Sequence, residues 1–74
     1  MPLSMAPAGI RSFICKITGK DEIRHFLGSL GFVEGEHVTV ISEMGGNMIV
    51  NVKDTRIAIS KAMANRIMVD DAAS

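Results

Sequence analysis

The side chains best suited to chemistry in this 74-residue chain are one cysteine and two histidines. Cys15, His25 and His37 lie in no catalytic motif, and the close pairs of a structural zinc site, such as C-x-x-C, are absent. Cys15 shares one face of an expected strand with Phe13 and Ile17, so we predict a buried, inert thiol. Both histidines are predicted to lie on the surface. We therefore expect no enzymatic activity, no cofactor and no metal site.

The sequence offers little for binding phosphates, bases or proline-rich peptides. The stretch "SLGFVEGEH" lacks the Lys and Ser or Thr of a phosphate-binding loop. Eight basic and eight acidic residues cancel, and three Phe without Trp or Tyr cannot supply an aromatic groove. The segment with Lys53, Arg56, Lys61 and Arg66 contains only Asp54 as a counter-charge, which leaves nucleic-acid binding open as an alternative.

Methionine is the one apolar residue type that suggests a contact surface. Four of the six methionines, Met44, Met48, Met63 and Met68, lie in the second half of the chain. They either fill the core of an aromatic-poor domain or serve as adaptable contacts at an interface. Met44, in an expected loop, and Met63, in an expected short helix, are the better interface candidates.

The length predicts one domain over residues 1–74, of which 1–8 and 70–74 are expected to fray. A single cysteine allows no internal disulfide, and no uninterrupted apolar run exceeds three residues. We therefore expect no membrane insertion. The start of the chain has no basic segment followed by a long apolar one, so we expect no signal peptide and a cytoplasmic location.

Two patterns dominate the first half of the chain. Residues 11–17 alternate with the period of a strand, and residues 21–30 carry an apolar stripe with the period of a helix. That stripe comprises Ile23, Phe26, Leu27 and Leu30. Asp21 is the expected N-cap. Gly31 is expected to end the helix, and Gly35 to occupy a turn position with positive φ.

The second half reads as strands joined by tight turns. Strands are expected at 37–42, 48–52, 56–59 and 67–69, with a hairpin turn at Gly45 and Gly46. Ser60 is expected to cap a short helix over 61–66. The chain is thus predicted to be mainly β, a small and highly bent barrel of about five strands with a helix in its first long connection.

These patterns together resemble the FeoA family over about residues 3–69. The matching stretches are "LSMAPAG", "ICKITG", "RHFLGSLGFVEGEHVTV" and "RIAISKAMANRIMV". The third, with its Leu-Gly helix end followed by Gly35 and a Val-rich strand, is the most specific. Glu34 departs from the Pro common in the family, and Ser60 from a common Arg. The resemblance implies an SH3-like β-barrel.

The same resemblance implies a non-enzymatic accessory protein of bacterial ferrous iron uptake. It implies docking on the cytosolic side of a FeoB-type membrane permease that carries a GTP-binding domain, with an effect on its assembly or activity. A stand-alone SH3-like regulatory module that senses metal or binds nucleic acid is the alternative. Weak self-association through an edge strand is a further expectation.

The partner surface is expected where the loops and the short helix meet. Its candidate residues are Met44, Gly45, Gly46, Lys61, Met63 and Arg66, with Gly28 as a seventh. Gly28 faces away from Ile23 and Leu30, where Ala would favour the helix by about 1 kcal/mol. The glycine is therefore either tolerated or leaves room for a partner. Gly31 and Gly35 are expected to be structural.

Overall fold

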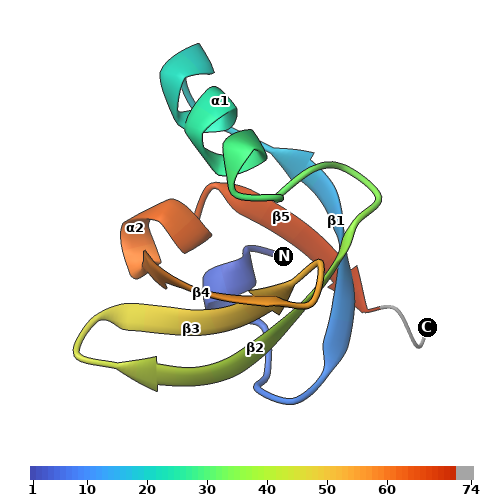
Figure 1. Cartoon of the computed structure of the whole chain (residues 1–74), viewed down its shortest axis with the longest axis vertical. Helices are drawn as coiled ribbons and strands as arrows, with labels where there is room; N and C mark the ends of the chain where they lie inside the picture. The colour runs from blue at the N-terminus through green and yellow to red at the C-terminus, as the bar shows by residue number, and fades with distance from the viewer. Residues whose placement is uncertain (72–74) are drawn as a thin grey trace.

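The computed structural model describes residues 1–71. Five antiparallel strands form one strongly bent sheet in the order β4-β3-β2-β1-β5 (Figure 1). The elements along the chain are the 3-10 helix η1 (Leu3–Met5), β1 (Arg11–Ile17), α1 (Asp21–Ser29), β2 (His37–Met44), β3 (Asn47–Val52), β4 (Thr55–Ser60), α2 (Lys61–Ala64) and β5 (Ile67–Asp71). The predicted order of strands and helices is confirmed. Within these residues, no helix is both long and apolar enough to cross a membrane.

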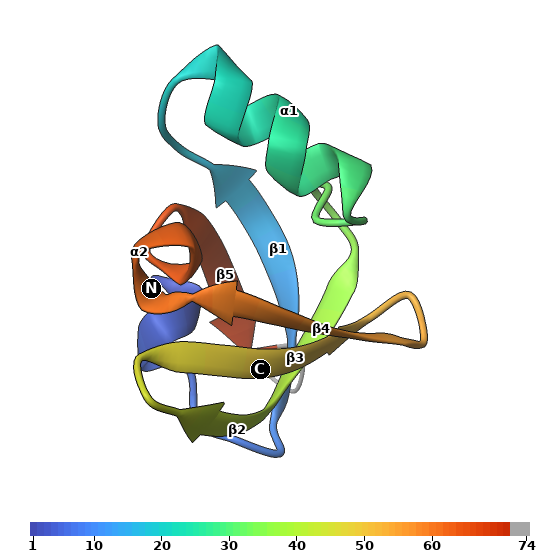
Figure 2. The same cartoon turned by 60° about the vertical axis from the view of Figure 1, so that its left-hand side comes forward.

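An aliphatic core lies inside the bend of the sheet. Val38 and Val40 of β2 are buried, as are Met48, Val50 and Val52 of β3, so the period-two prediction for both strands is confirmed. The other fully buried large side chains come from every part of the fold, namely Leu3, Ile14, Leu27, Phe32, Ile67 and Val69. Figures 1 and 2 show α1 over one end of the sheet, away from the β2–β3 turn.

Helix α1 ends as predicted but does not begin as predicted. Gly31 has φ of +108°, its N–H donates to the Gly28 carbonyl at 3.0 Å, and the Phe32 N–H donates to the Leu27 carbonyl at 3.0 Å. This pair of bonds is the Schellman motif, with the buried side chains of Leu27 and Phe32 beside it. The predicted N-cap, Asp21, is wrong: Lys20 occupies that position without a side-chain bond, and Asp21 lies in the first turn.

The predicted apolar stripe of α1 is only partly buried. Leu27 is buried, and Ile23 and Leu30 pack against the core as half-buried side chains. Phe26, in contrast, is 49% exposed. The helix covers only the end of a narrow sheet, so one edge of its apolar stripe stays in contact with solvent.

The predicted burial of Cys15 is also wrong. The pairing of β1 with β5 shifts between Ile14 and Lys16, so Cys15 lies at a bulge without a strand partner in β5. Ser12 and Ile14 point into the core, and Cys15 is exposed. The alternation is present in β1, but the buried face carries Ser12 and Ile14 rather than Phe13 and Cys15, so the prediction chose the wrong face of the strand.

The N-terminal residues pack against the domain, contrary to the prediction that residues 1–8 fray. Leu3 is fully buried, and Met1 exchanges backbone hydrogen bonds of 2.7 and 3.0 Å with Val69. Pro2 forms a bridge with Met68, so the segment covers the outer edge of β5. Of the other end expected to fray, Asp70 and Asp71 belong to β5, and residues 72–74 lie outside the described residues.

Candidate partner interface

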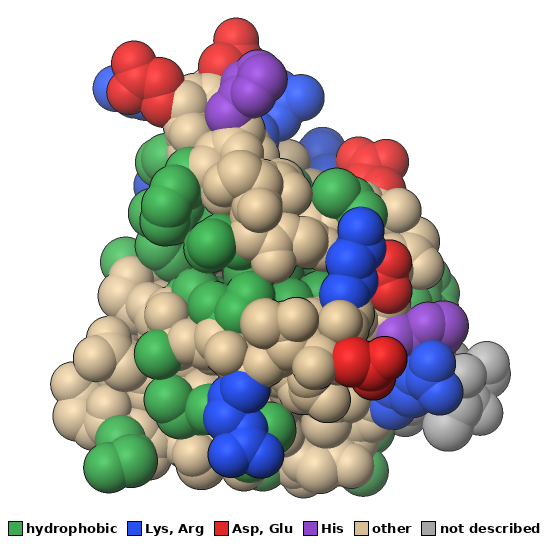
Figure 3. Space-filling model, viewed as in Figure 1, with side chains coloured by type: hydrophobic (Ala, Val, Ile, Leu, Met, Phe, Trp, Pro, Cys, Tyr) green, Lys and Arg blue, Asp and Glu red, His purple; other side chains and the backbone are tan. Residues whose placement is uncertain are grey.

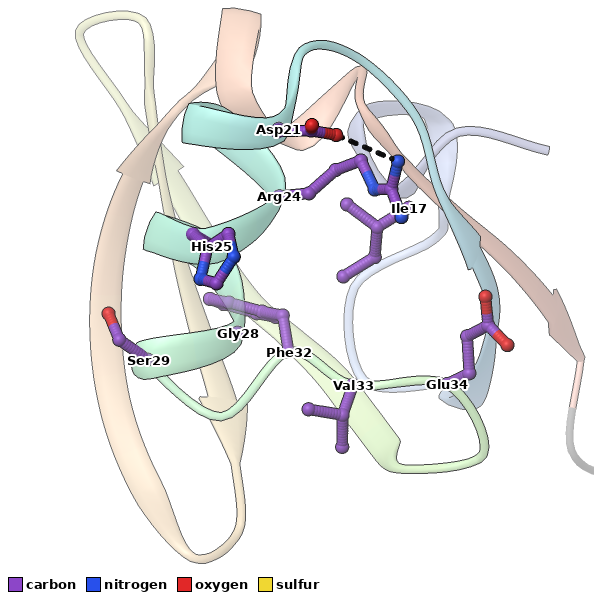
Figure 4. Close-up of a pocket in the computed structure, with 9 residues that line it drawn as sticks. All are labelled: Ile17, Asp21, Arg24, His25, Gly28, Ser29, Phe32, Val33 and Glu34. Carbon is purple, nitrogen blue, oxygen red and sulfur yellow. Dashed lines mark hydrogen bonds and ion pairs between the residues drawn. The ribbon is translucent and has the colours of Figure 1, made fainter.

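A groove of about 750 Å³ runs between α1 and the segment that follows it. We call it the α1 groove, and its lining residues are Ile17, Asp21, Arg24, His25, Gly28, Ser29, Phe32, Val33 and Glu34 (Figure 4). The helix residues recur at intervals of three and four, so they share one face of α1. The groove is therefore lined by a helix face on one side and by β1 and the turn at 33–36 on the other.

Backbone hydrogen bonds hold in place the side of the α1 groove that lies opposite the helix. The Gly35 N–H donates to the Ile14 carbonyl at 2.7 Å, and the Glu36 N–H closes a turn onto Val33 at 3.1 Å. Gly35 has φ of +87°, which confirms its predicted turn role. Val33 is thereby presented at the rim with 39% of its surface exposed.

Gly28 makes the floor of the α1 groove accessible. A Cβ placed on Gly28 would meet no atom within 4 Å, so the glycine is not required by packing inside this chain. Figure 4 shows Gly28 between His25 and Phe32, with the Arg24 side chain reaching toward Ile17. Arg24 pairs with Asp21 at 3.3 Å, but both side chains are well exposed, so this ion pair adds little stability.

A second exposed surface surrounds the β2–β3 turn. Gly45 and Gly46 have φ of +53° and +83°, the values of a two-residue type I′ turn, which confirms the predicted hairpin. Beside the turn, Met44 is 69% exposed. The Lys61 N–H donates to the Gly46 carbonyl at 3.1 Å, and the Lys61 ammonium pairs with Glu43. We call Met44, Gly45, Gly46 and Lys61 the hairpin surface.

The seven predicted partner residues therefore divide between different places. Met63 is half-buried and packs against the core, and its N–H donates to Ser60 Oγ at 3.2 Å, which confirms the predicted cap. Arg66 lies beside Gly19, and its carbonyl accepts from the Thr18 N–H at 2.7 Å. Gly28 lines the α1 groove, and the other six residues do not.

Phe26 and Val33 are exposed apolar side chains that the sequence analysis did not place on the surface. Phe26 was assigned to the core because its spacing fits the buried stripe, and nothing in the spacing separates the edge of a stripe from its centre. Val33 carried a usable signal: a large apolar residue within a tight turn is rarely buried there.

Of the three residues suited to chemistry, His25 lines the α1 groove, whereas Cys15 and His37 lie outside both surfaces. The Cys15 thiol donates to Asp70 Oδ2 at 2.9 Å. This hydrogen bond, with smaller contributions from burial and from the charge of Asp70, raises the pKa of Cys15 above its ordinary value. His25 and His37 are exposed, as predicted. Among residues 1–71, no three His, Cys, Asp or Glu side chains are placed to hold a metal ion.

Comparison with known families identifies the family of this chain. The model of the FeoA domain matches residues 1–71. The chain belongs to the FeoA family. A Methanocaldococcus jannaschii protein named as an Fe(2+) transport protein A is 34% identical over 71 residues, which are 96% of this chain and 87% of that protein. The resemblance inferred from the sequence is thus confirmed.

Two solved FeoA structures share the fold along most of their length. A crystal structure of the iron uptake regulatory protein FeoA is 35% identical, with a TM-score of 0.86 over 93% of this chain and 92% of that one. The Stenotrophomonas maltophilia FeoA was solved with zinc and is described as a prokaryotic SH3 domain protein. It is 32% identical to this chain, with a TM-score of 0.83 over 95% of this chain and 89% of that one. The predicted SH3-like fold is confirmed.

Proposed function

We propose that this FeoA-family chain is a non-enzymatic, cytoplasmic accessory protein of ferrous iron uptake. It docks on the cytosolic side of a FeoB-type permease that carries a GTP-binding domain, and it modulates the assembly or activity of that permease. The family match over residues 1–71 is the observation that carries this proposal. The names of two similar proteins, an Fe(2+) transport protein and an iron uptake regulatory protein, support it.

The exposed surfaces supply what a docking module needs. Met44 projects from a turn whose backbone is held by Lys61, so a large, adaptable side chain is presented on a fixed support. The α1 groove offers a concave surface with half-buried Ile17, exposed Val33 and an open position at Gly28, above the fully buried side chain of Phe32. Apolar anchors that fill a partner's pocket, or pockets that receive one, contribute most of the affinity at protein interfaces.

Binding of variants to the purified permease tests the proposal. We expect Met44→Asp to weaken binding by about tenfold or more, because a desolvated carboxylate would replace an apolar anchor. Met5→Asp is the matched control, since Met5 is an equally exposed methionine on η1, outside both surfaces. If both variants and the wild type bind the permease with equal affinity, the hairpin surface is not part of the interface.

Met63 is a poorer position for this test. Its side chain packs against the core, so Met63→Asp is expected to unfold the domain rather than to report on docking. No observation among the described residues favours the metal-sensing or nucleic-acid-binding alternative. Both therefore stay predictions.

A further inference from the structure

A polar concavity of about 380 Å³ lies on the outer face of the sheet, separate from the α1 groove and the hairpin surface. It is lined by Arg11, Glu36, His37, Thr39, Asn51, Lys53 and Asp54. Figure 3 shows a histidine together with basic and acidic side chains on one flank of the molecule. Its volume falls within the range of small-ligand sites.

The strand register places its central residues in one row. Arg11 pairs with Thr39, and Thr39 pairs with Asn51, across β1, β2 and β3. Their neighbours along the strands are buried, so these three side chains point to the outer face. A guanidinium, a hydroxyl and an amide are therefore aligned on a rigid sheet rather than on a loop.

The charged groups of the concavity are left unpaired. Arg11 and Lys53 lie in the same hollow as Glu36 and Asp54, yet within residues 1–71 the side chains of the concavity make no hydrogen bond or ion pair. Elsewhere on the surface, Lys61 does pair with a nearby carboxylate. Both signs of charge thus stay available to a ligand.

The turn that presents two of these charges is conformationally costly. Lys53 and Asp54 have φ of +51° and +60°, the left-handed region, which lysine seldom adopts and aspartate adopts less readily than glycine. The β2–β3 turn has the same length and uses Gly45 and Gly46 at the equivalent positions. The Lys53 stem lies beside Gly31, which further restricts where its ammonium can point. Charged residues held in a strained conformation indicate selection for something other than stability.

We propose that the polar concavity binds a small zwitterionic ligand, an amino acid or short peptide that carries one carboxylate and one ammonium group. Its carboxylate lies between Arg11 and Lys53, with Thr39 and Asn51 as further donors. Its ammonium faces Glu36 and Asp54. A ligand with both charges matches a site of two cations and two carboxylates, whereas a simple anion would meet the carboxylates unfavourably.

Titration of the ¹⁵N-labelled chain with glycylglycine, followed by amide chemical shifts, tests the site. We expect saturable shifts confined to residues 11, 36–39 and 51–54. Acetate, methylammonium and inorganic phosphate at equal ionic strength should bind roughly tenfold more weakly, since each satisfies one half of the site. Absence of saturable shifts, or binding of phosphate or acetate as tight as that of glycylglycine, would overturn the proposal.

A turn variant separates the site from the fold. The double variant Lys53→Asn with Asp54→Gly introduces the preferred type I′ pair, so we expect a higher Tm together with loss of glycylglycine binding. Lys16→Gln, an exposed charge on β1 outside the concavity, should keep the wild-type affinity. If the double variant binds glycylglycine as tightly as the wild type, the concavity is not the binding site. An unchanged or lower Tm would show that Lys53 and Asp54 do not strain the turn, which would remove one of the observations behind the proposal.

Discussion

At the scale of single residues, Cys15 illustrates how one contact sets reactivity. Its thiol is exposed, but the hydrogen bond to Asp70 and the charge of that carboxylate favour the protonated form and raise the pKa. Since the thiolate is the reactive species, alkylation should be slow near neutral pH. The outer face of β1 thus leaves the thiol exposed and places it beside the Asp70 carboxylate of β5, which keeps it unreactive.

Replacement of the carboxylate should reverse this effect. In Asp70→Asn, the pKa of Cys15 should fall toward its ordinary value, so iodoacetamide should modify the thiol faster at a fixed pH of about 8. Mass spectrometry of the time course measures the rate. Equal rates in the wild type and Asp70→Asn would show that the hydrogen bond does not control the thiol.

At the scale of elements, Gly28 inside α1 and Gly31 just after its end have opposite expected effects on stability. Gly31→Ala places a Cβ at φ of +108°, which should destabilise the domain by about 1–2 kcal/mol. Gly28→Ala lies inside the helix with open space around the new Cβ, so it should stabilise the domain by about 1 kcal/mol. Urea denaturation of both variants gives the two free energies of unfolding.

Gly28→Ala also distinguishes tolerance from docking. If a partner approaches the backbone in the α1 groove, the variant should be more stable yet bind the permease less tightly. Increased stability with unchanged affinity would mean that the α1 groove is not part of the interface.

Most elements could be predicted from the sequence because their signals are local. The alternation in β2 and β3, the Gly45–Gly46 turn and the Gly31 helix end each follow from residues within a few positions of one another. The exposure of Phe26 and Cys15 could not be predicted in this way. The exposure of Phe26 depends on how far α1 extends beyond the sheet, and that of Cys15 on which face of β1 packs on the core. Both are set by segments distant in the sequence.

At the scale of the whole molecule, the N-terminal segment completes a core that the strands alone leave open. Residues 1–8 carry no periodicity, so no sequence pattern predicts a packed Leu3. In the structure, η1 places Leu3 in the core and the backbone of Met1 binds β5. In a domain this small, one such side chain is a large part of the total stability.

Truncation of that side chain provides a direct check. Leu3→Ala should destabilise the domain by about 2–5 kcal/mol, the usual range for a fully buried leucine. Met5→Ala, two residues away and exposed, should change the stability by less than about 0.5 kcal/mol. A Leu3→Ala variant as stable as the wild type would mean that the N-terminal segment does fray, as the sequence alone predicted.

The placement of the candidate site was less predictable than the fold. Sequence reasoning chose Met44, Gly45, Gly46 and Lys61 from separate segments, and the structure brings them together at one turn. It also grouped Arg66 and Gly28 with them, although these lie on other parts of the surface. Exposure and concavity arise from the packed domain, so no local pattern encodes them.

The central claim is that this chain acts by docking on a FeoB-type permease. Titration of the full chain against the detergent-solubilised permease under reducing conditions, with GTP hydrolysis followed in the same samples, tests it most directly. We expect saturable binding that Met44→Asp weakens and Met5→Asp does not. An absence of detectable binding, with or without guanine nucleotide, would contradict it.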